Sequence, residues 1–152
     1  MHASATGVSG ARAESRVHLR LPATSANLGA GFDATAVALN LFLEIIAEPA
    51  NEFSISATGR DAARCARLQD NLILETYTRA LAANHKPAVP LALSMQNAIP
   101  LGMGCGSSAA GRLAAIALAN HFGHLGWSGE QIVEEACVLE GHPDNAAACW
   151  LG

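Results

Sequence analysis

The stretch IPLGMGCGSSAA, residues 99–110, decides the fold, because it places three glycines at alternate positions, then two serines and an alanine-rich run. Glycines at this density favour a turn with positive φ, or a place where another group approaches the backbone closely. Residues 108–123 are helix-forming apart from Gly111, and Gly123 is typical of a helix stop. We therefore predict a tight loop that leads directly into the N-terminus of a helix.

A loop of this kind is typical of anion-binding sites. The first N–H groups of a helix have no partner within the helix, and the helix dipole is positive at that end. A Walker A loop would end in Gly-Lys-Ser/Thr and a dinucleotide loop would read GxGxxG, and residues 102–108 fit neither pattern. From these residues alone, the loop either cradles a phosphate or is a strand-to-helix turn that binds nothing.

Composition limits the class of protein. The 152 residues are 51% hydrophobic and 14% charged with a net charge of −4, which predicts one folded domain and does not favour a nucleic-acid partner. The low charge indicates that a second domain or a partner covers part of the surface. No apolar run is long enough for a membrane helix. Residues 1–15 are expected to be a disordered tail. Four widely spaced cysteines predict reduced thiols and a cytoplasmic location: Cys65, Cys105, Cys137 and Cys149.

The rest of the chain reads as alternating strands and helices. Strands are expected at 17–21, 40–48 and 52–58, the last two as an antiparallel pair, and another within 88–100. Residues 70–85 have the spacing of an amphipathic helix with Asp70 or Asn71 as N-cap. Ser128 and Gln131 predict a capping box that starts a helix over 128–141. The apolar residues 146–151 are expected to start a further strand.

Two more segments accompany the glycine loop: PATSANLGAGFD at 22–33 and EGHPDN at 140–145. Together with residues 99–110, they resemble the GHMP kinase family over residues 17–152. The resemblance implies an α+β fold, in which the N-terminal domain is similar to the second domain of ribosomal protein S5. It also implies a ferredoxin-like C-terminal domain, which we expect to be absent from these 152 residues. Residues 16–152 are then expected to be a truncated ATP-binding domain.

The resemblance also implies an activity. The HPDN motif is similar to the one that separates the homoserine-phosphorylating members from the mevalonate and galactose members. The expected reaction transfers a phosphoryl group from ATP, with Mg²⁺, to the side-chain hydroxyl of L-homoserine, a step of threonine biosynthesis. The isolated chain is expected to be inactive, with its other half or a homodimer as partner. The alternative is a non-catalytic nucleotide-binding or assembly fragment.

The resemblance implies roles for specific residues of this chain. Ser108 is expected to meet Mg²⁺ together with Glu134. Glu135 and Glu140 are close alternatives for this carboxylate, although a solvated helix face is the favoured explanation for those two. Asn71 matches an asparagine near the adenine, although a helix N-cap explains it almost equally well. The remaining nucleotide contacts implied by the resemblance are Pro100, Leu101, Gly102, Met103, Gly104, Cys105, Gly106 and Ser107.

The acceptor pocket is expected to contain Asn27, Asp33, His142 and Asn145. Asp33 would pair with the ammonium group of the amino acid, and Asn27 would bond a polar group. Turn formation is the alternative for the two asparagines, since Asn is common in tight loops. Asp144 could serve as a general base by its chemistry, but the resemblance argues against that role and implies catalysis by positioning and charge stabilisation.

Overall fold

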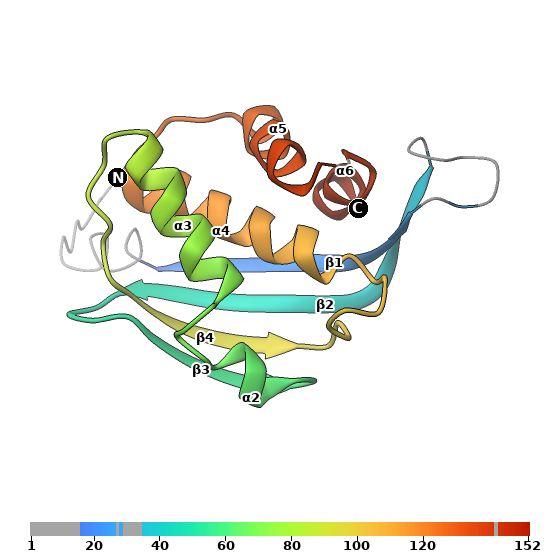
Figure 1. The fold of residues 1–152 in the computed structure, drawn as a ribbon, viewed down its shortest axis with the longest axis horizontal. Helices are drawn as coiled ribbons and strands as arrows, with labels where there is room; N and C mark the ends of the chain where they lie inside the picture. The colour runs from blue at the N-terminus through green and yellow to red at the C-terminus, as the bar shows by residue number, and fades with distance from the viewer. Residues whose placement is uncertain (1–15, 27, 29–34, 142) are drawn as a thin grey trace, which may run out of the picture.

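The computed structural model describes residues 16–26, 28, 35–141 and 143–152. Figure 1 shows a sheet whose one face carries the long helices, an α+β arrangement that confirms the predicted class. The elements are β1 (Val17–Ala26), β2 (Ala36–Pro49), β3 (Ser54–Gly59), α2 (Ala62–Cys65), α3 (Leu72–Ala83), β4 (Leu91–Asn97), α4 (Ser107–Gly123), α5 (Gly129–Glu140) and α6 (Pro143–Leu151). Within this described part, no helix is both long and apolar enough to cross a bilayer. The predicted tail lies outside the described residues.

The sheet has four strands in the order β1-β2-β4-β3. β2 pairs antiparallel with both β1 and β4, whereas β3 pairs in parallel with β4. The predicted antiparallel pairing of 40–48 with 52–58 is therefore wrong. β4 occupies the edge of β2 that β3 would have used, because the connection through α2 and α3 is long enough to return the chain for a parallel pair.

Helix ends follow the predicted capping residues. The Asn71 side chain accepts hydrogen bonds from the N–H groups of Ile73 and Leu74, so Asn71 rather than Asp70 is the N-cap of α3. Ser128 and Gln131 form the predicted capping box at the start of α5. These local hydrogen bonds fix where each helix begins, independently of what it packs against.

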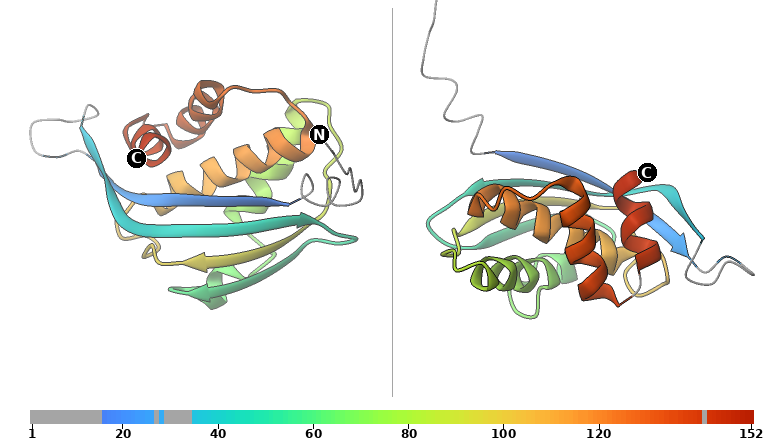
Figure 2. Two further views of the ribbon diagram at one scale, coloured as in Figure 1. Left: turned by 180° about the vertical axis from the view of Figure 1, so that it is seen from behind. Right: turned by 90° about the horizontal axis from the view of Figure 1, so that it is seen from above.

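Helix α4 is the centre of the helical layer. Its buried positions include seven residues with at most one side-chain carbon, so neighbouring elements approach its backbone closely: Ala109, Ala110, Gly111, Ala114, Ala115, Ala119 and Gly123. A Cβ added at Gly123 would lie 2.3 Å from Leu81 Cδ2 on α3. Figure 2 shows α4 between the sheet and the C-terminal helices from two directions.

The C-terminal residues form a helix and not the predicted strand. Pro143 is the first residue of α6, a position where its missing N–H costs nothing, and Ala146–Ala148 have high helix propensity. Ala146 and Cys149 are buried on one face, three residues apart. The Cys149 thiol donates to the Pro22 carbonyl oxygen at 3.1 Å, which attaches α6 to β1. A short apolar run is compatible with a strand or a helix, and the high helix propensity of its alanines favours the helix.

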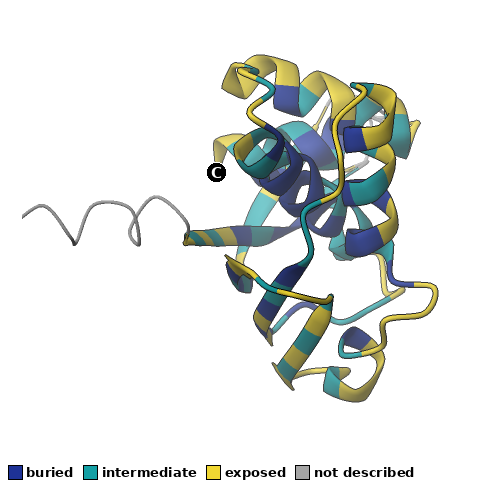
Figure 3. Cartoon of the chain, turned by 90° about the vertical axis from the view of Figure 1, so that its left-hand side faces the viewer, coloured by how far each residue is buried: buried dark blue, intermediate teal, exposed yellow. Residues whose placement is uncertain are grey.

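The core lies between the sheet and the helices, where the buried residues gather in Figure 3. Leu91 and Leu93 of β4, Tyr77 of α3 and Leu113 of α4 are each at most 2% exposed. The Tyr77 hydroxyl donates to the Val89 carbonyl oxygen at 2.9 Å, which satisfies the polar end of this buried ring. The helical layer is therefore held rigidly over one face of the sheet.

Close packing around α4 predicts that added volume destabilises the chain. Ala114 is 0% exposed, so Ala114→Leu should lower the free energy of unfolding by about 1–3 kcal/mol through overpacking. The matched control is Ala82→Leu at an exposed position of α3, which should change it by no more than about 0.5 kcal/mol. Urea unfolding of the 152-residue chain measures both. Equal effects of the two substitutions would show that α4 is not closely packed.

Candidate nucleotide and metal site

The glycine loop joins β4 to α4. Gly102, Gly104 and Gly106 have φ of 71°, 70° and 66°, in the left-handed region that favours glycine. A Cβ would meet nothing within 4 Å at Gly102 or Gly104, but at Gly106 it would lie 1.9 Å from Thr24 Oγ1. The first two glycines therefore leave the backbone open, and Gly106 allows a close contact with β1.

Hydrogen bonds fix both ends of the loop. The Thr24 N–H donates to the Cys105 carbonyl oxygen at 3.1 Å, and the Leu101 N–H donates to Asp61 Oδ2 at 3.2 Å. The buried Asn97 side chain donates to the Ile99 carbonyl oxygen at 2.8 Å and accepts from the Ile99 N–H at 3.1 Å. The loop is thus anchored to β1, α2 and β4, so its amide groups are held in place before any ligand binds.

Among the described residues, no side chain caps the N-terminus of α4. Its N-cap is Gly106, which has no side chain to accept from the first amides, and the first turn contains no acidic residue. Ser107 and Ser108 are the first two helical residues. The positive end of this 17-residue helix therefore faces the loop with uncompensated N–H groups, which suits an anion.

Ser108 contacts a carboxylate on α5. Its hydroxyl donates to Glu140 Oε1 at 2.5 Å, and Arg112 Nε lies 2.6 Å from the same oxygen. Both contacts use Oε1, and within the described part of the chain Oε2 stays open to another ligand. Glu140 is only 15% exposed, so this ion pair is shielded from solvent. Two oxygen-bearing side chains and one cation therefore lie together beside the α4 N-terminus: Ser108, Glu140 and Arg112.

The carboxylate beside Ser108 is thus Glu140 and not Glu134, the residue expected from the sequence. Glu134 and Glu135 are both exposed, and Glu134 lies six positions before Glu140 on α5. Six residues correspond to about 240° of rotation, so the two carboxylates cannot point the same way. The expectation that Glu140 lies on a solvated face is wrong, because it continues the buried stripe of Ile132 and Ala136 at four-residue spacing.

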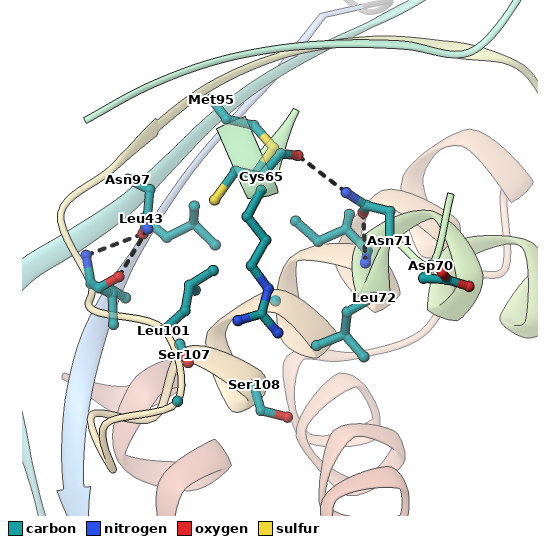
Figure 4. A pocket seen from close by; sticks show the side chains of 15 residues that line it. Leu43, Cys65, Asp70, Asn71, Leu72, Met95, Asn97, Leu101, Ser107 and Ser108 are labelled. Carbon is teal, nitrogen blue, oxygen red and sulfur yellow. Dashed lines mark hydrogen bonds between the residues drawn. The ribbon is translucent and has the colours of Figure 1, made fainter. Parts of the chain in front are cut away.

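A cavity of about 320 Å³ opens beside the loop. Figure 4 shows Ser107 and Ser108 toward one end of it and Cys65 and Met95 toward the other. Its apolar walls come from both the sheet and the helices: Leu43, Leu72, Ile73, Met95, Ile99 and Leu101. Arg64 also lines it and forms no ion pair among the described residues. Asp70 lines it as well, so the cavity combines an apolar interior with serines and one charged side chain of each sign.

Asn71 builds the wall of this cavity. Besides capping α3, its side-chain nitrogen donates to the carbonyl oxygens of Cys65 at 3.2 Å and Arg67 at 2.8 Å. Its oxygen and nitrogen are therefore committed to the protein, which supports the N-cap explanation. Burial raises the pKa of the neighbouring Cys65 thiol, so this part of the wall is neutral at physiological pH.

Of the four predicted acceptor residues, only Asn145 is described, since Asn27, Asp33 and His142 lie outside the described residues. Asn145 lies in the first turn of α6, and its Oδ1 accepts from the Thr24 hydroxyl at 2.8 Å. Asp144 is 8% exposed, and its Oδ2 has no hydrogen-bond partner within the described structure. α6 therefore brings Asn145 to the same buried threonine that contacts the glycine loop.

Three residues of this region were missed or misplaced in the sequence analysis. The inward position of Glu140 could have been predicted from the sequence, because a carboxylate that continues an apolar stripe at i+4 spacing points inward. Thr24 lies within a recognised motif, but nothing in its spacing shows which groups its hydroxyl contacts. Arg64 stands in a short segment without clear periodicity. Both depend on tertiary contacts that only the fold reveals.

Within the described residues, no group of three or more His, Cys, Asp or Glu side chains is placed to hold a metal ion. A fully protein-built metal cage is therefore not present in this part of the chain. The Ser108 and Glu140 oxygens suit instead a hard cation that takes its other ligands from water and phosphate.

Comparisons with known proteins show the family of this chain. Residues 71–152 match the model of the GHMP kinases N terminal domain. The homoserine kinase of Solibacter usitatus is 44% identical over 135 residues, which cover 89% of this chain and 44% of that protein. The homoserine kinase of Moorella thermoacetica is 43% identical, over 88% of this chain and 45% of its own length. The chain therefore spans less than half the length of these relatives.

Solved structures with a similar fold include other GHMP-type kinases. A Listeria monocytogenes protein with a provisional homoserine kinase assignment superposes with a TM-score of 0.74 at 39% identity, over 86% of this chain and 45% of that one. Mevalonate kinase from Staphylococcus aureus shares the fold, with a TM-score of 0.62 at 21% identity over 91% of this chain and 51% of that one. With its glycine loop, its open helix N-terminus and a family match over more than half of its residues, the chain belongs to the GHMP kinase family.

Proposed function

We propose that this chain is the nucleotide-binding part of a homoserine kinase, which transfers a phosphoryl group from ATP to the side-chain hydroxyl of L-homoserine. The observation that carries the proposal is the anchored glycine loop, which presents the uncapped N-terminus of α4 beside the Ser108–Glu140 pair. The names of the relatives support the acceptor. The product, O-phosphohomoserine, would serve threonine biosynthesis.

In this proposal the loop holds the phosphates and the cavity holds the base. The amides of Gly102 to Ser108 would bind phosphate oxygens, and Gly102 and Gly104 leave open space above the backbone for them. The apolar walls around Leu72 and Met95 suit an aromatic base. The Arg64 guanidinium supplies a positive charge, which the glycine loop itself lacks because it contains no lysine.

The Ser108 and Glu140 oxygens fit Mg²⁺, which prefers hard oxygen ligands and is usually held by one or two carboxylates plus substrate phosphates. When bound, Mg²⁺ would neutralise charge on the transferring phosphoryl group. Arg112 holds the Glu140 carboxylate in position through its 2.6 Å contact. We propose Glu140 as the metal carboxylate in place of Glu134.

Transfer itself would depend on positioning more than on a general base. Asn145 stands with Thr24 near the loop, and Asn27, Asp33 and His142 remain proposed acceptor contacts. The walls of the site would orient the acceptor hydroxyl toward the phosphate, and good orientation lowers a barrier by about 7–11 kcal/mol. No step is assigned to Asp144.

A second candidate is a non-catalytic nucleotide-binding or assembly module. The observation that favours it is a set of exposed apolar side chains, which an assembly partner would cover. We propose a further domain or partner chain as the cover for three exposed apolar side chains, Met103 at 73%, Val138 at 78% and Leu151 at 80%. A homodimer would give twice the monomer mass in light scattering. We also propose a cytoplasmic location.

The metal proposal predicts that Ser108→Ala and Glu140→Gln weaken binding of MgATP about 10-fold, because each removes one charge-stabilising oxygen. ATP binding without Mg²⁺ should change little. Calorimetry on the 152-residue chain measures both affinities. The matched control is Glu134→Gln, on the exposed face of the same helix. If Glu134→Gln abolished the effect of Mg²⁺ on ATP affinity and Glu140→Gln left it unchanged, Glu134 would be the metal ligand.

The acceptor proposal predicts that kcat/KM for L-homoserine exceeds that for mevalonate or galactose by at least about 100-fold, because a pocket that hydrogen-bonds an amino acid leaves polar groups unpaired with the others. ADP release by the complete gene product, with each acceptor in turn, tests this. Nucleotide binding without transfer to any acceptor would favour the non-catalytic module, and equal activity with mevalonate would exclude the assignment to homoserine.

A further inference from the structure

Thr24 lies where β1, the glycine loop and α6 meet. Its side chain is completely buried, at 0% exposure. Its backbone N–H donates to the Cys105 carbonyl oxygen at 3.1 Å, and its hydroxyl donates to Asn145 Oδ1 at 2.8 Å. A single residue of β1 therefore contacts both the loop proposed for the phosphates and the asparagine proposed for the acceptor.

The contact with the loop is close. A Cβ at Gly106 would lie 1.9 Å from Thr24 Oγ1 and 3.1 Å from Thr24 Cβ, so only glycine allows this approach. Gly106 is also the N-cap of α4, and its position sets where the helix amides begin. The side chain of Thr24 therefore limits how far the loop can move toward β1.

The hydroxyl of Thr24 also determines what Asn145 can offer a ligand. A carboxamide has one acceptor oxygen and one donor nitrogen. Oδ1 accepts from Thr24, while the one contact of Nδ2 among the described residues is a long one of 3.4 Å with Asp144 Oδ1. The Asn145 N–H donates to the same Asp144 oxygen at 2.7 Å, which holds the backbone at the start of α6. Asn145 is thus left with its donor group for a ligand.

We propose that Thr24 is a positioning residue, which orients the Asn145 carboxamide so that its NH₂ group faces the acceptor, and which holds that group in register with the glycine loop. The proposal rests on the proposed function. The new proposal adds the chemistry of the group that Asn145 recognises. This group is a hydrogen-bond acceptor, such as the hydroxyl or carboxylate oxygen of a hydroxy amino acid.

Thr24→Val tests the hydroxyl separately from the rest of the residue, because valine keeps the shape and the backbone bond to Cys105. We expect kcat/KM for L-homoserine to fall about 10-fold, since the partly buried oxygen of Asn145 loses its partner. The KM for ATP should stay within about 2-fold, because the backbone contacts of the loop persist. Thr24→Ser should recover most of the loss. Equal losses for both substrates, or no recovery by serine, would overturn the proposal.

A matched control separates positioning from stability. Thr76 is another buried threonine, 5% exposed, and lies on α3 outside the residues that line the cavity. Thr76→Val should change unfolding by a similar amount and leave both KM values unchanged. If Thr76→Val reproduces the kinetic effect of Thr24→Val, the role of Thr24 is only structural.

A double-mutant cycle shows whether Thr24 acts through Asn145. If it does, Thr24→Val should add less than about 2-fold to the loss caused by Asn145→Ala, because the side chain that Thr24 orients is already gone. Asn145→Asp keeps the bond from Thr24 but replaces the donor with an acceptor, so it should raise the KM for the amino-alcohol. Additive losses, or an unchanged KM in Asn145→Asp, would contradict the proposal.

A spectroscopic measurement decides the same question without catalysis. In the ¹⁵N-labelled 152-residue chain, the Asn145 side-chain amide should be ordered in the wild type and in Thr24→Ser, and mobile in Thr24→Val. If its order parameter is the same in all three, Thr24 does not fix Asn145. A complete gene product that phosphorylates no acceptor would refute the proposed function, yet this measurement would still show whether Thr24 holds the carboxamide.

Discussion

The close packing of α4 against the sheet is the constraint on which the site depends. Small residues along α4 bring its backbone near β1 and α3, and Gly106 at its start touches the buried side chain of Thr24. Because the helix cannot shift without overlapping these neighbours, its first amides have a fixed position. A preorganised set of N–H groups can bind an anion without first rearranging, which is what phosphoryl transfer requires of a protein.

Charge around this helix start is distributed over several elements. The amide groups and the dipole are positive at the loop, and Arg64 adds a cation from α2 on the wall of the cavity. The negative Glu140 comes from α5 and is held by Arg112 and Ser108 of α4. In the proposed function the phosphates would meet the positive groups and a metal ion would meet the carboxylate, so the nucleotide and its cation could be bound together.

Local sequence signals predicted the parts of this structure that local physics determines. The capping box at Ser128, the N-cap at Asn71 and the loop-to-helix junction at Gly106 are all decided by hydrogen bonds or backbone angles within a few residues. The parallel pairing of β3 was missed, because it depends on the path of the chain through α2 and α3. The identity of the Ser108 partner was also missed, although the Ile132, Ala136 and Glu140 stripe carried the signal.

The central claim is that the open N-terminus of α4 binds the phosphates of a nucleotide. The most direct measurement is a titration of the ¹⁵N-labelled 152-residue chain with a non-hydrolysable ATP analogue and, separately, with adenosine. The analogue should shift the amide resonances of Gly104, Gly106 and Ser107 most strongly, whereas adenosine should affect residues around Leu72 and leave the loop amides nearly unchanged. Shifts confined to the outer face of the sheet around His18 and Ser94, with the loop amides unaffected by the analogue, would contradict the account.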